Sequence, residues 1–222
     1  MDAREFLDAH WPSRGYYCVA IPISWIDEDT GEKKAAFKHF IYDTVGGAYK
    51  KYETLREKHD VYFAVNTLKE NKTKGARVHE NMAFSRSLFL DLDVEPTGKG
   101  GKYTTQKAAV GALEEFCANV GLPIPTLVSS GYGVHCYWRF DTDISVSAWL
   151  QYAELLHRLI MHWNFKADPN CIKDQSRVLR IPGGLNFKNR DAPKRVVVKH
   201  AAGEVTTTDI WGILVDACEA TR

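Results

Sequence analysis

Two amphipathic helices set among short β-prone runs constrain this fold more than any other feature of the sequence. Residues 104–120 begin at a Thr-Thr pair, repeat apolar residues every three or four positions and end at Gly121, as helices do. Residues 145–163 carry a second apolar stripe of the same period. Short β-prone runs lie before and between these helices, at 87–94, 125–130 and 134–140. This interleaving predicts an α+β fold with a mixed or antiparallel sheet.

The N-terminal part adds a predicted β-hairpin. Residues 16–26 and 35–42 are apolar and β-prone, and a turn-rich segment around Gly31 joins them. The remaining predicted elements are helices at 45–59 and 207–218, strands at 61–65 and 195–199, and a long polar loop at 66–82. The sequence contains no repeat and no obvious linker, so we expect one domain over residues 1–222.

Composition excludes several classes of protein. The 222 residues are 45% hydrophobic and 26% charged, which is typical of a folded domain. No apolar run approaches the roughly 18 residues of a membrane helix, and no basic-then-apolar leader opens the chain. Five scattered cysteines without a CxxC pair argue against a disulfide framework or a zinc knuckle. We therefore expect a cytoplasmic protein with no membrane partner.

Charge is unevenly distributed although its sum is close to zero. The net formal charge is +1, from 29 basic and 28 acidic residues. The stretch 173–199 holds eight basic residues against two acidic ones, so its net charge is +6 and that of the rest of the chain is −5. One basic patch on a neutral protein predicts contact with a polyanion at one face. A solvated charged surface is the alternative for Arg190, Lys194 and Arg195.

Two aspartates follow an apolar run in the segment LFLDLDV (88–94). Alternation along a strand puts Asp91 and Asp93 on the same face, with the intervening leucines on the other. Neighbouring carboxylates repel each other, and Mg²⁺ or Mn²⁺ removes that conflict by binding their oxygens. The alternative is a strand end whose aspartates simply face water, and this motif alone does not decide between the two.

A glycine turn precedes a histidine in the segment SSGYGVHCYW (129–138). Gly131 and Gly133 permit a tight turn and a close approach of the backbone to a ligand. His135 follows directly and can donate a hydrogen bond to a phosphate oxygen, as can the two serine hydroxyls before the turn. The alternative is a β-hairpin in which His135 is a satisfied core residue. Core packing is the preferred interpretation for the Tyr-Trp pair that follows.

The segment ADPNCIKDQSRVLRIPGGLNFK (167–188) combines cations, carboxylates and a sharp turn. Guanidinium groups match phosphate geometry, and the Pro-Gly-Gly turn would present the polar residues after it. Either aspartate could complete a triad with the first motif. A surface loop with incidental charge is the alternative, but it leaves these features without a common cause. The candidate side chains are Asp168, Asp174, Arg177, Arg180, Asn186 and Lys188.

The three segments together fit one reaction. Three carboxylates can hold two metal ions that align an attacking oxygen with a nucleoside triphosphate, while basic side chains and the histidine neutralise its phosphates. In this order and spacing, the motifs resemble those of the archaeo-eukaryotic primase superfamily, in particular the primase-polymerases of phages and plasmids. Residues 60–71 (DVYFAVNTLKEN) also resemble the strand and loop before the first motif. The resemblance covers roughly residues 60–190.

The resemblance implies a role for each motif residue. Asp91 and Asp93 match the paired metal ligands, and His135 matches the histidine that contacts the phosphates of the incoming nucleotide. Asp168 matches the third ligand, with Asp174 as the second choice. The implied nucleotide-binding set is Ser129, Ser130, His135, Arg177, Arg180, Asn186 and Lys188.

The resemblance also implies a fold and partners. The expected fold is an N-terminal α/β module (1–85) packed on an RRM-like catalytic module (86–222), with the active site between them. The expected activity is two-metal DNA synthesis from dNTPs, or also NTPs, on a primed single-stranded DNA template in a bacterial or archaeal cell. Template contacts are expected from the loop at 66–82 and the basic face, at Lys69, Lys72, Lys74, Arg77 and Arg190.

Two departures from the family pattern affect these expectations. Gly184 stands where a hydroxyl residue is common in the family, which removes one polar contact. The chain also ends near residue 222 without the helical priming domain or helicase that often follows the core. We therefore expect such a domain as a further partner, and we expect primer extension to be more efficient than initiation.

Two other functions compete with this one. A non-catalytic module that binds single-stranded nucleic acid on an RRM-like sheet predicts exposed aromatic residues on that sheet. A rolling-circle nuclease needs two histidines that flank one apolar residue, and the sequence contains no such pair, because His157 and His162 lie five positions apart. The nuclease therefore ranks last.

Overall fold

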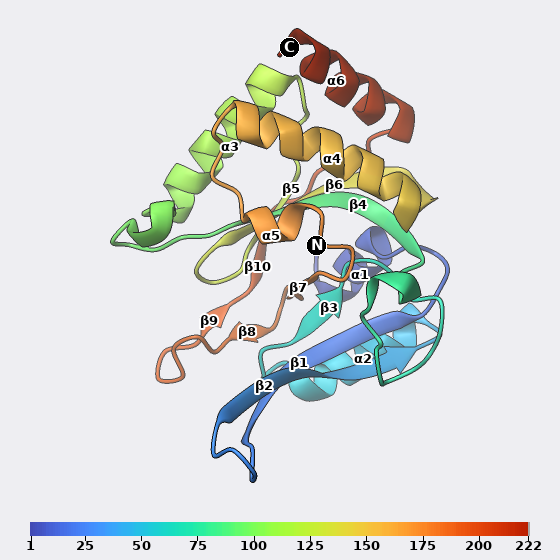
Figure 1. The fold of residues 1–222 in the computed structure, drawn as a ribbon, viewed down its shortest axis with the longest axis vertical. Coiled ribbons are helices and arrows are strands. Elements are labelled where there is room, and N and C mark those ends of the chain that lie inside the picture. Colours follow the sequence, from blue (N-terminus) through green and yellow to red (C-terminus); the bar gives the residue numbers. More distant parts are fainter. Residues whose placement is uncertain (222) are drawn as a thin grey trace.

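Two four-stranded sheets form the framework of the molecule, for which the computed structural model describes residues 1–221 (Figure 1). The first sheet has the order β2-β1-β3-β7 and the second the order β10-β5-β6-β4. All neighbouring strands within both sheets are antiparallel, which confirms the predicted α+β class. The strands are β1 (Tyr17–Ile26), β2 (Lys33–Tyr42), β3 (Tyr62–Ala64), β4 (Phe84–Leu92), β5 (Thr126–Ser129), β6 (Val134–Ser145), β7 (Val178–Arg180) and β10 (Val197–His200), with β8 (Leu185–Asn186) and β9 (Lys194–Arg195) pairing as a separate ribbon.

The helices cover the sheets on their outer sides. Figure 1 shows α3, α4 and α6 above the second sheet, and α2 lies against β1 and β2 of the first. The helices are α1 (Ala3–His10), α2 (Val45–Leu55), α3 (Gln106–Val120), α4 (Val146–His162), α5 (Pro169–Ile172) and α6 (Thr207–Ala220), with 3₁₀ turns η1 (His79–Asn81) and η2 (Lys99–Gly101). Within residues 1–221, no helix combines the length and apolar character needed to cross a bilayer.

The predicted hairpin and the two diagnostic helices are present. β1 and β2 pair along their whole length, from Tyr17 opposite Tyr42 to Ile26 opposite Lys33. The Thr105 hydroxyl caps the start of α3, and Gly121 ends it in the left-handed conformation at φ 84°. α2 differs from the prediction, because it ends at Leu55 rather than near residue 59. The next residues close a turn on the Leu55 carbonyl instead of continuing the helix.

Helix α1 was not predicted, although its start carries a recognisable signal. The Asp2 carboxylate accepts from the Glu5 backbone N–H, and the Glu5 carboxylate accepts from the Asp2 backbone N–H, which forms a capping box. The helix buries Phe6, whose ring contacts those of Phe63 in the first sheet and Tyr137 in the second. α1 therefore fastens the two sheets together through one continuous core.

The C-terminal half contributes a strand to the first sheet. β7 pairs with β3, from Ala64 opposite Val178 to Tyr62 opposite Arg180. The predicted boundary between the two modules, after residue 85, falls within β4. The chain thus crosses from one sheet to the other three times, after β3, after β6 and between β7 and β10. β7 carries the basic third motif to the space between the sheets.

Candidate active site

Strand pairing brings the first two motifs together. β4 and β6 are adjacent, with Asp91 directly opposite His135. The His135 Nε2 atom lies 4.0 Å from Asp91 Oδ1, and its Nδ1 atom lies 3.4 Å from the Tyr137 hydroxyl. Tyr137 and Trp138 are fully buried, as their preferred interpretation predicts. His135 is both buried in the core and directed toward a carboxylate.

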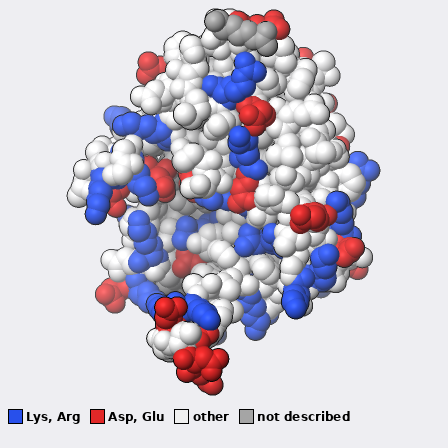
Figure 2. Space-filling model, viewed as in Figure 1, with Lys and Arg blue, Asp and Glu red and all other residues white. Residues whose placement is uncertain are grey.

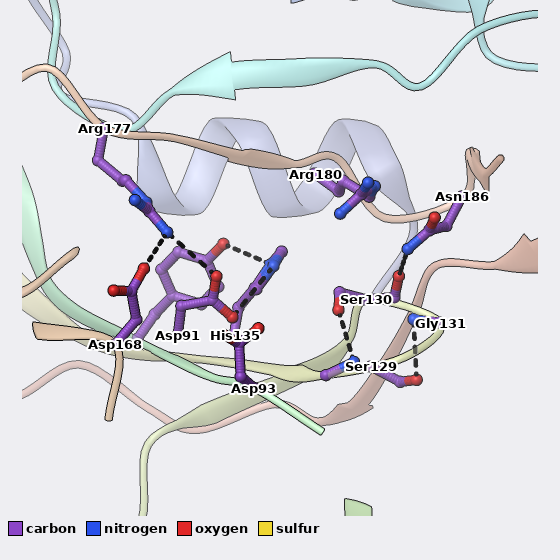
Figure 3. Close-up of polar contacts among 12 residues, drawn as sticks. Asp91, Asp93, Ser129, Ser130, Gly131, His135, Asp168, Arg177, Arg180 and Asn186 are labelled. Carbon is purple, nitrogen blue, oxygen red and sulfur yellow. Dashed lines mark hydrogen bonds and ion pairs between the residues drawn. The ribbon is translucent and has the colours of Figure 1, made fainter. Parts of the chain in front are cut away.

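The third motif adds a carboxylate and a guanidinium to this pair. The Asp168 backbone N–H donates to the Asp91 carbonyl at 2.9 Å, and the Asp168 side chain caps α5 by accepting from Asn170. Arg177 Nη2 donates to Asp168 Oδ2 at 2.7 Å and to Asp91 Oδ2 at 3.2 Å. Figure 3 shows Arg177 above the two carboxylates, with His135 beside them. Residues distant in sequence therefore converge around one positive charge.

The two other candidate carboxylates have separate partners. Asp93 pairs with Lys102 Nζ at 2.8 Å. Asp174 accepts from the backbone N–H and the hydroxyl of Ser176 at 2.9 and 2.7 Å. Asp168, and not Asp174, is therefore the third-motif carboxylate beside Asp91.

The donor set of Asp91, Asp93 and Asp168 fits a divalent cation. Their oxygens are the hard ligands that Mg²⁺ and Mn²⁺ prefer, and two of the carboxylates already share the Arg177 charge. Among residues 1–221, no three acidic, histidine or cysteine side chains are gathered closely enough to hold a metal ion as they stand. Arg177 and Lys102 hold the carboxylates in separate ion pairs.

A cavity of about 440 Å³ opens beside this cluster, between the two sheets. We call it the Arg180 cavity. Its polar wall includes Asp91, His135, Arg177 and Arg180, and its far wall includes Phe37 and Tyr62 of the first sheet. The Arg180 Nε atom donates to Asp60 Oδ1 at 2.9 Å, which fixes the guanidinium at the rim.

The protonation states of the two central groups are shifted in opposite directions. Burial raises the pKa of Asp91 to about 6, against the opposing effect of Arg177. Burial, together with the charges of Arg180 and Arg177, lowers the pKa of His135 to about 3. His135 is therefore neutral at neutral pH and offers one N–H donor rather than a positive charge.

Four predicted nucleotide-binding residues brace the glycine turn instead of lining the Arg180 cavity. The Ser129 hydroxyl bonds to Gln106, and the Ser130 hydroxyl accepts from the Gly133 N–H. The Asn186 side chain donates to the Ser130 carbonyl at 2.6 Å and accepts from the Lys188 N–H at 2.9 Å. Figure 3 shows the contact between Asn186 and Ser130 apart from the Arg177 cluster.

The predicted template contacts lie at several places on the surface. Lys69 and Lys72 bond to Glu80 and Glu70 within their own loop. Arg77 donates to the Ser176 carbonyl at 2.6 Å and lines the Arg180 cavity. Four members of the set are exposed, namely Lys69, Lys72, Lys74 and Arg190, whereas Arg77 is half-buried.

Sequence reasoning missed two residues that position this site. Asp60 holds Arg180 and also accepts from the Phe187 backbone N–H at 3.2 Å. Its one signal is its place directly before the predicted strand at 61–65. Lys102 reaches Asp93 from a glycine-rich loop that carries no periodic pattern, so its role has no sequence signal.

Comparisons with known proteins agree with this architecture. No family model matches the chain. A replication protein of Clostridium perfringens is 28% identical over 176 residues, which are 75% of this chain and 40% of that protein. The chain therefore spans less than half of the curated relative that it matches.

Solved structures provide the second comparison. The AEP domain of the primase-polymerase of cyanophage S-2L aligns with a TM-score of 0.55 at 20% identity, over 90% of this chain and 89% of that one. The catalytic domain of primase RepB′, in complex with initiator DNA, aligns with a TM-score of 0.56 at 14% identity, over 98% and 93% of the two chains. The chain thus has the fold of these primase-polymerase and primase catalytic domains, which is the fold that its three motifs predict.

Proposed function

We propose that the chain is the catalytic core of a DNA primase-polymerase, which adds nucleotides to a primer strand on a single-stranded DNA template. The observation that carries the proposal is the convergence of Asp91 and Asp168 on Arg177, beside His135 and at the wall of the Arg180 cavity. Nucleotidyl transfer requires carboxylates that hold cations, next to guanidinium groups that bind phosphates.

Asp91, Asp93 and Asp168 are the residues proposed to hold Mg²⁺ or Mn²⁺. When bound, such an ion polarises a phosphoryl oxygen and favours deprotonation of the attacking hydroxyl. Asp174 is the weaker candidate, because its Oδ1 atom is engaged by Ser176. The capping contact of Asp168 with Asn170 uses one carboxylate oxygen and leaves the other directed at Arg177.

Arg177, Arg180 and His135 are proposed to bind the nucleoside triphosphate. The guanidinium groups offset the charge that grows on the departing pyrophosphate. His135 is neutral, so it contributes a directed hydrogen bond and orients the phosphates. Asp60 keeps Arg180 at the cavity rim through their 2.9 Å contact.

The template strand is proposed to follow the basic side chains around the site. Figure 2 shows Lys and Arg side chains around a hollow that crosses the face containing the site. Phosphate contacts of this kind make binding depend steeply on salt. The proposal also includes three further properties: initiation without a primer, use of NTPs, and cooperation with a helicase or helical priming domain.

A primer-extension assay tests the central claim. Wild-type protein should extend a labelled primer with dNTPs in Mn²⁺ or Mg²⁺, and EDTA should stop the reaction. The double substitution Asp91→Asn with Asp93→Asn should reduce extension to background while single-stranded DNA binding is retained. The matched control, Asp29→Asn with Asp216→Asn, removes two exposed aspartates and should extend at the wild-type rate.

Two results would contradict the proposal. In the first, wild-type protein extends no primer and binds neither dNTP nor Mn²⁺. In the second, the Asp91→Asn, Asp93→Asn variant extends primers as fast as wild type. If the protein binds single-stranded DNA in both forms and extends in neither, it is a non-catalytic binding module.

A further inference from the structure

A second cavity lies next to the carboxylates, and the proposed function leaves it without a ligand. It measures about 430 Å³ and is lined by Asp93, Asp168, Lys102 and Lys166, together with Gly100, Gly101, Ala167, Pro169 and Asn170. We call it the Lys102 cavity. Within residues 1–221, it has no lining residue in common with the Arg180 cavity.

The carboxylates form the wall between the two cavities. Asp91 lines the Arg180 cavity, whereas Asp93 and Asp168 line the Lys102 cavity. Arg177, from the first cavity, reaches across to Asp168 of the second at 2.7 Å. The proposed metal ligands are thus accessible from two directions, and each direction offers its own space.

Nucleotidyl transfer brings two phosphate-bearing reactants to such carboxylates. One is the nucleoside triphosphate, and the other is the strand whose terminal hydroxyl attacks it. Because the displacement is in line, the attacking and leaving oxygens lie on opposite sides of the reacting phosphorus. The two reactants therefore need separate binding sites on either side of the carboxylates.

The two cavities differ in the cations they present. The Arg180 cavity contains three arginines and the His135 imidazole, and guanidinium forks suit the several oxygens of a triphosphate. The Lys102 cavity contains two lysines, whose compact ammonium groups suit single phosphodiesters. Lys102 already lies at a carboxylate, 2.8 Å from Asp93, so a phosphate that it binds would be beside the reacting centre.

The glycine loop keeps the mouth of the Lys102 cavity open. Gly100 and Gly101 have φ angles of 72° and 73°, which favour glycine. A Cβ atom at either position would meet no described atom within 4 Å. The backbone here is therefore free of side chains and can approach a polynucleotide closely.

We propose that the Lys102 cavity binds the 3′-terminal phosphodiester of the primer strand, with Lys102 and Lys166 as its contacts. This inference rests on the proposed function, since it assigns the second reactant of the same site. It divides the cations by reactant: Arg177 and Arg180 serve the triphosphate, and the two lysines serve the primer end.

The test compares primer binding with nucleotide binding. The double substitution Lys102→Gln with Lys166→Gln should raise the Kd for a fluorescent primer–template, measured by anisotropy, about tenfold and lower its salt dependence by about one unit of log–log slope per lysine. The Kd for dNTP, measured by calorimetry, should stay within about twofold of wild type. Arg180→Gln should show the reverse pattern: it should raise the Kd for dNTP and leave the Kd for primer–template unchanged.

Two controls isolate the primer end. Lys99→Gln removes an exposed lysine of the same loop that does not line the cavity, and it should bind primer–template like wild type. Lys102→Arg keeps the charge and should retain most of the affinity. Unprimed single-stranded template should bind equally to wild type and to the double lysine variant, whose urea unfolding midpoint verifies that it is folded.

Distinct results overturn the inference. If the lysine variant loses dNTP affinity and keeps primer affinity, the Lys102 cavity belongs to the triphosphate. If the double lysine variant loses as much affinity for unprimed template as for primed DNA, the lysines contact the template. If wild type extends primers and the lysine variant binds primer–template with wild-type affinity, this inference fails while the proposed function stands. If wild type neither binds dNTP nor extends primers, both the inference and the proposed function fail.

Discussion

Arg177 is the residue on which the electrostatics of the site depend most directly. It contacts two carboxylates, Asp91 and Asp168, whose side chains are only 18% and 17% exposed. Charges in such places are poorly solvated, and like charges raise the cost of ionising each other. The raised pKa of Asp91 reflects its burial even with the guanidinium present.

We expect Arg177→Gln to destabilise the fold by about 1–3 kcal/mol at pH 7, because two neighbouring carboxylates lose their shared charged donor. Urea unfolding measures the change. The matched control is Arg195→Gln, which breaks an exposed pair with Glu57 and should cost less than about 1 kcal/mol. Equal costs for the two substitutions would show that the Arg177 cluster contributes no more than a surface pair.

His10 provides a pH-dependent term in stability that is separate from the site. It is fully buried in α1, stacks on Phe6 and contacts the Ser87 hydroxyl at 3.2 Å. Burial, together with the charges of Arg139 and Arg86, lowers its pKa to about 3. The unfolded chain, with an ordinary histidine pKa of ~6.5, therefore binds protons more readily than the folded chain as pH falls.

Stability contributed by neutral His10 is present above pH ~6.5 and is lost as pH falls toward 3. We expect wild type to lose about 2 kcal/mol more than His10→Gln between pH 7 and pH 5, since each pKa unit is worth about 1.4 kcal/mol. Urea unfolding at the two pH values measures this difference. His135, whose pKa is also low, contributes equally to both proteins. Parallel pH profiles for the two would contradict the assignment to His10.

At this scale, local sequence predicts residues that share a strand or a turn better than residues that meet across the fold. Strand alternation predicted one face for Asp91 and Asp93, and the turn motif singled out His135. Asp60 and Arg180 are separated by 120 positions, and Lys102 follows a glycine loop, so tertiary structure alone brings them to the site. The same limit applies to the serines: the Ser130 hydroxyl accepts within the turn, whereas the Ser129 hydroxyl bonds to Gln106 of α3.

Among the elements, periodicity predicts long helices and paired strands well and short segments poorly. α3, α4 and α6 have caps and enough turns to show an apolar face. β7 has three residues and α5 has four, which is too short for a period to appear. Both are stabilised by partners elsewhere: β7 by pairing with β3, and α5 by packing against β4 and α4.

The turn between β5 and β6 shows how closely elements approach at the site. A Cβ atom at Gly133 would lie 2.7 Å from the Leu92 carbonyl oxygen, at the end of β4 between the two first-motif aspartates. We expect Gly133→Ala to lower the stability of the fold by about 1–3 kcal/mol, because the added Cβ overlaps this carbonyl oxygen. The same overlap should shift Asp93 and so lower primer extension.

Gly212→Ala is the matched control for Gly133→Ala. It lies inside α6, where an added Cβ meets no described atom within 4 Å. Alanine there should stabilise the protein by about 0.5–1 kcal/mol, because it reduces the backbone freedom lost on folding. The two Gly→Ala changes should therefore move the thermal midpoint in opposite directions. A midpoint that rises for both would mean that β4 and the turn are not in contact.

For the whole molecule, the site depends on how the two sheets are joined. The Arg180 cavity takes Phe37 and Tyr62 from the first sheet and Asp91 and His135 from the second. A fixed distance between the sheets is therefore a condition for the proposed binding of one triphosphate. α1 and β7 both cross this junction, and neither was predicted, so the sequence indicated two modules without indicating how firmly they are connected.

Phe6 tests that connection, because its ring contacts Phe63 at 5.7 Å and Tyr137 at 5.3 Å between ring centres, one on each sheet. Phe6→Ala should cost about 3–5 kcal/mol as a buried cavity and lower the thermal midpoint by roughly 10 °C. Since one core spans both sheets, we expect a single transition in calorimetry, with near- and far-ultraviolet circular dichroism coinciding. Trp163→Ala, at a side chain that is 42% exposed, should shift the midpoint little. If calorimetry instead shows two transitions, one of them at the wild-type temperature, the sheets unfold independently. The distance across the cavity would then be set by the ligand rather than by the core.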